Sequence, residues 1–279
     1  MEKNHVVRII CPDQKGLIAA VAGVLYSNGI NILAMKEFVE TETTTFFARL
    51  EIEGQWEAKN LLQQLTAALP ATSKISVIPR RKKNIVVMVT KEHHCLGDLL
   101  MRHYFDRLQA NILAVIGNHD DLRTFTEKFD IPFHTVSHQG ISHEEFEQQL
   151  LNVLSQYDAE YIVLAKFMRI LSPAFVSRYE ERIINIHHSF LPAFAGANPY
   201  KKAYERGVKL IGATAHIVNN HLDDGPIITQ QIIPVKHDDG VRDMIDAGRE
   251  IEKAVLAEAL KLIVEDRIFV SNNKTIVFM

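Results

Sequence analysis

The chain has 279 residues, of which 47% are hydrophobic and 23% charged, a balance typical of a folded globular protein with one large domain or two ordinary ones. Its formal net charge of −3 at pH 7 implies no strong electrostatic field that would attract nucleic acid or an anionic membrane.

The sequence also bears on the compartment. The two cysteines, Cys11 and Cys95, lie far apart without metal-ligand spacing, so we expect no disulfide framework and a reducing environment. The first residues lack the apolar core of a signal peptide, and no apolar stretch approaches the ~20 residues of a membrane span. We therefore expect a cytoplasmic protein.

Residues 1–80 contain apolar patterns that predict six elements. The first strand is expected at residues 6–11, and the helix that follows begins near Leu17 and ends at Asn28-Gly29, because Gly adopts the left-handed backbone that closes helices. The remaining strands and helix are expected at residues 31–40, 44–53, 61–69 and 75–79, the last of these as an edge strand. The resulting βαββαβ order is the ferredoxin-like arrangement.

A basic run, Arg80-Arg81-Lys82-Lys83, follows this first domain. We interpret residues 81–84 as a solvated linker that leads to a second domain over residues 85–279. A phosphate-binding patch is the alternative interpretation of the same run.

Beyond the linker, unbroken apolar runs alternate with helical patterns. Residues 85–89 contain no polar side chain, as expected of a parallel strand that is covered on both faces. Further elements are expected as strands at 112–116, 161–165, 183–186, 211–218 and 226–235 and as a long helix at 241–265. This alternation predicts an α/β domain with a doubly wound, mostly parallel, Rossmann-like sheet.

The stretch Asn185-Ile186-His187-His188-Ser189-Phe190-Leu191-Pro192 places an amide and an imidazole after a predicted buried strand. Ligands of open α/β sheets bind just beyond the carboxyl ends of strands. Asn185 and a protonated His187 are able to donate to the anionic oxygen of a tetrahedral intermediate, and one such donor contributes about 3–4 kcal/mol. Asp223, in Leu222-Asp223-Asp224-Gly225-Pro226, would favour the imidazolium and hold or deprotonate water.

Each of these residues also has an ordinary structural interpretation. An Asn or His at a strand end is often a satisfied structural residue, and Asp223 before Asp224-Gly225 is a plausible turn former. The combination on one parallel sheet favours acyl-transfer chemistry that needs neither a metal nor a covalent nucleophile.

Three blocks in this order resemble the 10-formyltetrahydrofolate-dependent formyltransferase superfamily. They are the Asn185–Pro192 stretch, the stretch Gly212-Ala213-Thr214-Ala215-His216-Ile217-Val218 with the Asp223 block, and Leu164-Ala165-Lys166-Phe167-Met168-Arg169-Ile170-Leu171. The resemblance implies that the last block, through Met168, Arg169, Ile170 and Leu171, binds the folate.

The loop after the first strand of the second domain separates members of this superfamily. A phosphorylated acceptor needs a Gly-rich loop there, whereas Thr90-Lys91-Glu92-His93-His94-Cys95-Leu96-Gly97-Asp98 has one glycine and acidic residues. The His94–Leu100 stretch, Gly117-Asn118-His119-Asp120, and Phe194-Ala195-Gly196-Ala197-Asn198-Pro199-Tyr200 instead resemble the formyltetrahydrofolate deformylase family, and residues 11–18 resemble an ACT domain. The resemblance spans nearly the whole chain.

This resemblance implies hydrolysis of 10-formyltetrahydrofolate to formate and tetrahydrofolate, which would supply formate for purine synthesis and balance one-carbon pools. Asn185 and His187 would stabilise the oxyanion, while Asp223 would orient water and tune His187. His216 would either support Asp223 or be a core histidine.

Other histidines invite structural interpretations. His188 points away from His187 if the strand continues, which favours a structural role. His93 and His94 either line the acceptor site or lie in a solvated loop, and we favour the loop. Among thirteen histidines we find no helical His-x-x-x-His pair with a third ligand, so we expect no metal and no cofactor besides the folate substrate.

The ACT-like region implies an amino-acid effector, with glycine and methionine as the family's candidates, near Asp13, Gly16, Leu17 and Asn31. A role as an oligomer contact alone is the alternative, and we expect a homo-oligomer. Two other functions compete with hydrolysis: formyl transfer to an unphosphorylated amine, and a folate- or amino-acid-binding sensor without turnover.

Overall fold

The computed structural model describes residues 4–193 and 199–279 and divides them between two compact units. The first unit contains the chain up to Arg81 together with Glu265–Phe269 and Val277–Met279, and the second contains Lys82–Val264 and Val270–Ile276. Each unit is described by itself below.

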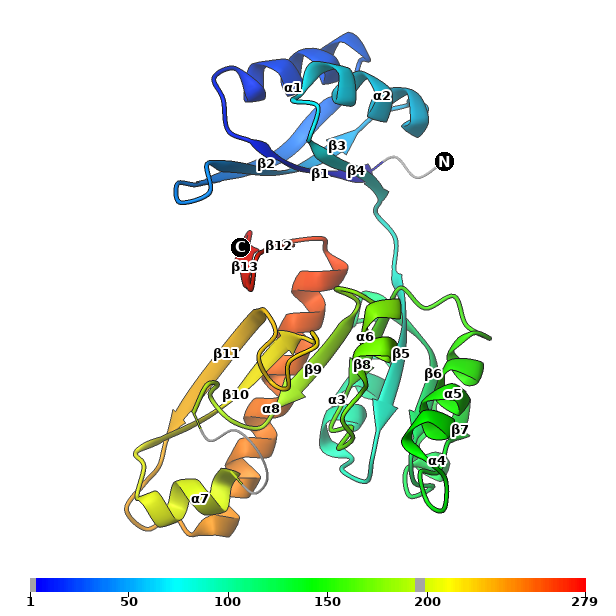
Figure 1. The fold of residues 1–279 in the computed structure, drawn as a ribbon, viewed down its shortest axis with the longest axis vertical. Helices are drawn as coiled ribbons and strands as arrows, with labels where there is room; N and C mark the ends of the chain where they lie inside the picture. The colour runs from blue at the N-terminus through cyan, green and yellow to red at the C-terminus, as the bar shows by residue number, and fades with distance from the viewer. Residues whose placement is uncertain (1–3, 194–198) are drawn as a thin grey trace. The chain divides into compact units, whose positions relative to one another are not determined.

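The first unit is a four-stranded antiparallel sheet with two helices on one face (Figure 1). Its sheet has the strand order β2-β3-β1-β4, so that β4 is an edge strand as expected. The elements are β1 (Asn4–Pro12), α1 (Leu17–Ser27), β2 (Asn31–Glu40), β3 (Thr45–Glu53), α2 (Ala58–Ala68) and β4 (Lys74–Pro79). All six elements of the predicted βαββαβ order are therefore present.

Alternation along β1 and β3 builds the core of this unit. Val7 of β1 lies opposite Leu50 of β3, Ile9 lies opposite Ala48, and each of these side chains is buried. Apolar residues of both helices, such as Leu25, complete the cluster. Burial of one such side chain contributes about 1.5–3 kcal/mol, which explains why the period-two pattern fixes the register.

The C-terminal end of the chain departs from the predicted division into residues 1–80 and 85–279. Arg49 donates to the carbonyls of Glu265 and Asp266, Arg8 donates to that of Ile268, and Phe269 packs edge-to-face on Phe47. Residues 265–269 and 277–279 thus belong to the first unit, because that unit's arginines satisfy their backbone oxygens.

The second unit is a seven-stranded sheet in the order β11-β10-β9-β8-β5-β6-β7. Pairings from β9 to β7 are parallel, and those of β10 with β9 and β11 are antiparallel. Its strands are β5 (Lys83–Val89), β6 (Ala110–Gly117), β7 (Phe133–Thr135), β8 (Tyr161–Leu164), β9 (Ile183–His187), β10 (Leu210–Ile217) and β11 (Ile227–Pro234). The sheet is mostly parallel, as the alternating pattern predicts.

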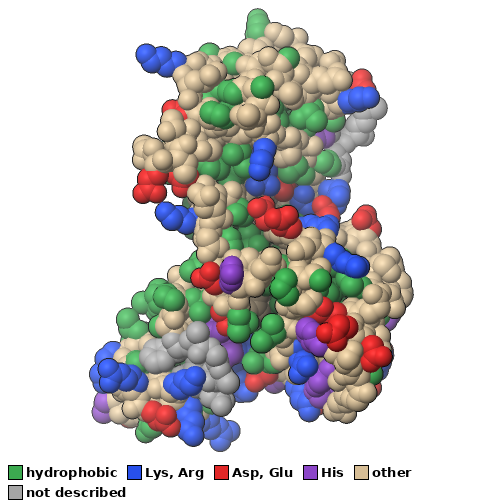
Figure 2. Space-filling view, in the orientation of Figure 1, with side chains coloured by type: hydrophobic (Ala, Val, Ile, Leu, Met, Phe, Trp, Pro, Cys, Tyr) green, Lys and Arg blue, Asp and Glu red, His purple; other side chains and the backbone are tan. Residues whose placement is uncertain are grey.

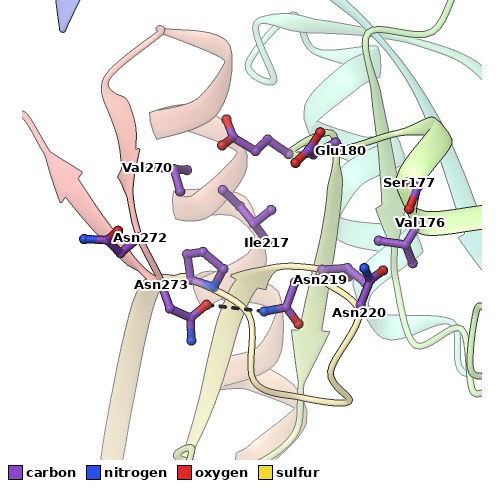
Figure 3. Close-up of a pocket in the computed structure, with 12 residues that line it drawn as sticks. Val176, Ser177, Glu180, Ile217, Asn219, Asn220, Val270, Asn272 and Asn273 are labelled. Atoms are coloured by element: carbon purple, nitrogen blue, oxygen red, sulfur yellow. Dashed lines mark hydrogen bonds between the residues drawn. The ribbon is translucent and has the colours of Figure 1, made fainter. Parts of the chain in front are cut away.

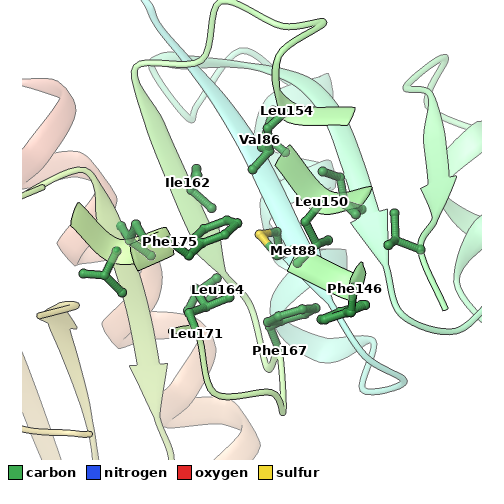
Figure 4. Close-up of a cluster of buried hydrophobic side chains, with 14 of the residues drawn as sticks. Val86, Met88, Phe146, Leu150, Leu154, Ile162, Leu164, Phe167, Leu171 and Phe175 are labelled. Atoms are coloured by element: carbon green, nitrogen blue, oxygen red, sulfur yellow. The ribbon is translucent and has the colours of Figure 1, made fainter. Parts of the chain in front are cut away.

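Helices cover both faces of this sheet. Helices α5 and α6 pack on one face, where the side chains of β5, β6 and β8 form a continuous apolar cluster with Phe146 and Phe175 (Figure 4). Helices α3 and α8 pack against the other face. The helices are α3 (His94–Tyr104), α4 (Arg123–Glu127), α5 (His143–Leu154), α6 (Pro173–Arg178), α7 (Pro199–Arg206) and α8 (Val241–Val264).

Three further features of the described chain differ from expectation. Lys83 does not lie in a solvated linker, because it begins β5, is 5% exposed and pairs with Glu160 at 3.7 Å. The short strand β7 was not expected. The two-stranded hairpin of β12 (Ile268–Ser271) and β13 (Lys274–Val277) was also not expected.

Charged side chains of both signs lie on the surface, in agreement with the small net charge. On the face that Figure 2 shows, Lys and Arg side chains are interspersed with Asp and Glu. Within the described residues, no helix is both long and apolar enough to cross a membrane.

Candidate active site

A cavity of about 420 Å³ lies at the carboxyl ends of β8 and β9 in the second unit. Asn185, His187 and Asp223, the three residues that the sequence singles out, all line it. Asn185 and His187 are alternate residues at the end of β9, so that their side chains share one face of the strand. Asp223 comes from the loop between β10 and β11. The structure therefore brings together groups that the sequence separates.

His187 and Asp223 form a direct pair. His187 Nδ1 lies 3.2 Å from Asp223 Oδ1, and the two side chains are 6% and 14% exposed. This hydrogen bond from His187, opposed by partial burial, holds the pKa of Asp223 below its usual range. His187 Nε2 is buried and has no hydrogen-bond partner among the described residues. A buried polar atom of this kind is expected to bind a ligand or water.

Asn185 is oriented by His216. The antiparallel register of β9 and β10 places Asn185 directly opposite His216, and the Asn185 Nδ2 donates to His216 Nε2 at 3.2 Å. His216 Nδ1 in turn donates to the carbonyl of Ile217 at 3.0 Å. Burial lowers the pKa of His216, which keeps the ring neutral and able to accept. One N–H of Asn185 remains available to the cavity.

This arrangement refines the role expected for His216. Its Nε2 lies 4.0 Å from Asp223 Oδ1, beyond hydrogen-bond distance, so its bond is to Asn185 and not to Asp223. His216 therefore positions the amide, while His187 is the direct partner of the carboxylate.

The loop that carries Asp223 is shaped by a close backbone approach. Asp223 has a left-handed φ of 55°, and a Cβ on Gly225 would lie 1.7 Å from the carbonyl oxygen of Ile217. Only glycine permits this contact. Strained backbone of this type is concentrated at functional sites.

A second cavity, of about 240 Å³, lies behind this loop (Figure 3). There Asn273, from the turn between β12 and β13, donates to the carbonyl of Asp224 at 2.7 Å and accepts from Asn219 at 3.3 Å. The unexpected C-terminal hairpin thus holds the residue next to Asp223.

The segment expected to bind folate lies on the first cavity. Phe167 and Leu171 are buried in the apolar cluster (Figure 4), which leaves Met168, Arg169 and Ile170 exposed at the cavity rim. The Met168 N–H donates to Thr90 Oγ1 at 2.9 Å, and His143 Nε2 donates to the Ile170 carbonyl at 3.0 Å. This loop is therefore anchored at both ends, and its role in binding folate stays a prediction.

His188 does not point away from His187. Strand β9 ends at His187, so the alternation that would separate the two rings stops there. The rings stack at 5.1 Å with an interplanar angle of 20°, and His188 lines the cavity. Burial, with a contribution from nearby Lys166, lowers the pKa of His188 to about 4. His188 is therefore neutral at physiological pH.

Sequence reasoning missed a buried polar cluster beside the cavity. His94, Lys166 and Tyr200 converge on Glu252 of α8. His94 is thus buried and bonded, and the expected solvated loop is wrong for it, whereas His93 is exposed as expected. The ammonium of Lys166 at a strand end was a usable sequence signal, but its partner lies too far along the chain to infer.

The residues expected near an effector lie in the first unit. Asp13 and Gly16 form the exposed turn before α1, and Asn31 begins β2. Leu17 is buried beneath that turn. The stretch from Phe194 to Asn198 lies outside the described residues.

Comparison with known protein families assigns a different family to each of the two parts of the chain. Residues 83–260 match the family model for formyl transferase, and residues 5–68 match that for the ACT domain. The chain is 53% identical over 277 residues to the formyltetrahydrofolate deformylase of Haemophilus influenzae, covering 99% of this chain and 100% of that one. It is 45% identical to the corresponding Bacillus subtilis protein, with 97% and 92% coverage.

Solved structures of a deformylase and of a transformylase are also similar to this chain. The crystal structure of a formyltetrahydrofolate deformylase from Pseudomonas syringae has a TM-score of 0.94 and 38% identity, covering 100% of this chain and 95% of that one. A glycinamide ribonucleotide transformylase from Symbiobacterium toebii matches 71% of this chain and 95% of its own, with a TM-score of 0.68 and 26% identity.

Proposed function

We propose that this chain, which belongs to the formyltetrahydrofolate deformylase family, hydrolyses 10-formyltetrahydrofolate to formate and tetrahydrofolate. The observation that carries the proposal is the convergence of Asn185, His187 and Asp223 on one cavity whose rim is the loop at residues 168–171. The cavity combines the side chains of that loop with hydrogen-bonding groups at the end of β9.

The reaction needs a water molecule, a formyl carbon and a proton for the departing nitrogen. The water oxygen attacks the formyl carbon, and negative charge develops on the formyl oxygen. The free N–H of Asn185 and a proton on His187 Nε2 donate to that oxygen, in the buried position where preorganised donors have most effect. The C–N10 bond then breaks, and N10 takes a proton as formate leaves.

Asp223 acts through His187 in this scheme. Its lowered pKa makes it a carboxylate at neutral pH and a weak base, so its main effect is to stabilise positive charge on the imidazole. The second carboxylate oxygen orients the water. The proton that this water loses on attack is balanced by the proton that N10 gains as the tetrahedral intermediate collapses.

The loop at residues 90–98 supports water as the acceptor. Helix α3 begins at His94, so Gly97 lies within a helix and not in a loop that cradles phosphate. Thr90 instead holds the Met168 N–H. No glycine-rich concavity for a phosphorylated amine is formed by these described residues.

The residues also support a reaction without a resident metal. Among the described residues, His94, Cys95 and Glu252 offer ligand atoms within 4.8 Å of one another and form a group that could hold a metal ion. However, Lys166 Nζ lies 3.1 Å from Glu252 Oε2. This ammonium already compensates the carboxylate and would repel a divalent cation.

We further propose that the N-terminal unit regulates the enzyme by binding a small amino acid, because residues 5–68 match the ACT family. Glycine and methionine are the candidates for titration calorimetry, and light scattering tests the expected homo-oligomer. The cytoplasmic location stays a prediction.

Formate release tests the proposed function. Purified protein is mixed with 10-formyltetrahydrofolate and no amine, and formate and tetrahydrofolate are measured together. Equimolar release of both products supports hydrolysis. Turnover that appears only after an amine is added would support a transferase, and folate binding without turnover would support a sensor.

A further inference from the structure

A buried carboxylate beside the cavity collects three partners from distant segments. Glu252, on α8, is 1% exposed. Its Oε1 accepts from Tyr200 Oη at 2.7 Å, and its Oε2 lies 2.7 Å from His94 Nε2 and 3.1 Å from Lys166 Nζ. Burial raises the pKa of Glu252, but the bonds from His94, Lys166 and Tyr200 outweigh it and lower the pKa to about 2. Glu252 is therefore ionised and fully paired.

The backbone is adapted to this cluster. A Cβ on Gly248, one turn before Glu252 on α8, would lie 2.1 Å from Tyr200 Oη. A glycine inside a helix is less favourable than alanine, and here it makes room for the tyrosine that reaches Glu252. The backbone of α8 is therefore adapted to accommodate this cluster in the second unit.

Lys166 connects this cluster to the cavity. It follows β8 in a left-handed conformation with φ of 62°, its side chain is 8% exposed, and it lines the cavity together with His187 and Asp223. A non-glycine residue with this φ is strained, and burying an ammonium is unfavourable unless it is paired. The fold tolerates both the strained backbone and the buried ammonium, and it thereby places a cation in the wall of the cavity.

We propose that Lys166 determines the acceptor of the formyl group, selecting water over amines, with Glu252 as the residue that positions its ammonium. The proposal rests on the function proposed above and names the residue that makes the reaction a hydrolysis. It depends on the juxtaposition of a fixed cation with His187 and Asp223 on one cavity.

The physical argument is one of charge. When a neutral amine attacks a formyl carbon, the oxyanion that forms is accompanied by a positive nitrogen, so the net charge does not change and a nearby ammonium stabilises the transition state little. When water attacks and loses its proton, the net developing charge is the negative oxyanion, which the same ammonium stabilises. In a buried site such interactions are weakly screened. Lys166 thus favours water, and it also repels acceptors that arrive as alkylammonium ions.

The neutral state of His188 agrees with the presence of a positive charge on Lys166 near the cavity. His188 stacks on His187 and lines the same cavity. Burial first, and then the charge of Lys166, lower the pKa of His188. The ammonium is therefore close enough to His188 to disfavour the charged form of that ring.

Lys166→Met tests the proposal, with Lys166→Arg as its matched control. Both variants keep a long side chain and the same left-handed backbone, but only Arg keeps the charge. The probe amine is hydroxylamine, which is small and largely neutral at pH 7. Its nitrogen bonds to the formyl carbon, the C–N10 bond breaks, and a proton moves from the hydroxylamine nitrogen to N10, giving formohydroxamate and tetrahydrofolate.

The readout is the ratio of formohydroxamate to formate at fixed hydroxylamine concentration, which a general loss of activity does not change. We expect Lys166→Met to raise this ratio about tenfold or more and Lys166→Arg to leave it near the unmodified protein's value. Binding of 5-formyltetrahydrofolate and the melting temperature are measured to establish that each variant is folded.

An unchanged ratio in folded Lys166→Met would overturn the proposal, even if its turnover falls. If Lys166→Met does not fold, Lys166→Gln gives the same test, because it also removes the ammonium but keeps a polar side chain that is able to donate to Glu252. There a several-fold rise in the ratio supports the proposal and an unchanged ratio overturns it. Failure of the unmodified protein to release formate is a separate result, which refutes the proposed function.

Discussion

Asp223→Asn is the substitution that tests the catalytic arrangement most sharply. The variant keeps the size of the side chain and an oxygen able to accept from His187 Nδ1, but removes the charge 3.2 Å from that nitrogen. Two unit charges at about this distance interact by about 4–5 kcal/mol at an effective dielectric constant near 20. If Asp223 acts by stabilising a positive imidazole in the transition state, kcat should fall by roughly 10³–10⁴-fold.

The assay is single-turnover formate release, paired with fluorescence titration of 5-formyltetrahydrofolate. We expect folate affinity to change far less than kcat, because the charge acts on the reacting end of the cavity. A fall in kcat of less than about tenfold in a folded variant would refute the reasoning, since ~1.4 kcal/mol is too small for a buried ion pair at this distance. Asp224→Asn, next to it in the chain, is the matched control and should retain most activity.

Three further predictions follow from the geometry. Removing the ring that orients the amide, in His216→Ala, should lower kcat about 10–100-fold with a smaller effect on KM, as measured in steady-state formate release. Gly225→Ala places a Cβ 1.7 Å from the Ile217 carbonyl oxygen, so we expect a lower melting temperature and a displaced Asp223 with little activity; an unchanged melting curve would contradict the close approach. Since the pKa of Glu252 is lowered to about 2 in the fold, its contribution to stability is complete above the unfolded value near 4.5 and is lost as the pH falls toward 2. The free energy of urea unfolding should therefore decline by up to about 3 kcal/mol over that pH interval through this group, a decline that Glu252→Gln should lack.

The sequence predicted those parts of the fold that depend on local patterns. The period-two alternation in β3 and the unbroken apolar run of β5 were sufficient, because burial on one face or on both leaves a direct mark on residue order. The hairpin of β12 and β13 was missed because each strand has four residues, although Asn272-Asn273 between apolar segments is a usable turn signal. The transfer of residues 265–269 to the first unit depends on Arg8 and Arg49, whose targets are backbone oxygens that carry no sequence signature.

The residues of the candidate site likewise include some that the sequence identified and some that it missed. Asn185, His187 and Asp223 were identified from strand ends and a turn, and the structure brings them onto one cavity. The polar cluster was missed because His94 and Glu252 are 158 positions apart, and a glutamate on a long charged helix resembles a solvated residue. His188 was misplaced because its orientation depends on where β9 ends, and strand ends are the least certain feature of such patterns.

The most direct test of the account is formate release from 10-formyltetrahydrofolate by the full chain with no acceptor added. We expect steady turnover in which formate and tetrahydrofolate appear in equal amounts and which Asp223→Asn reduces by at least ~10³-fold. Binding of the folate without release of formate, or release that begins only when an amine is supplied, would contradict the conclusion that this site transfers the formyl group to water.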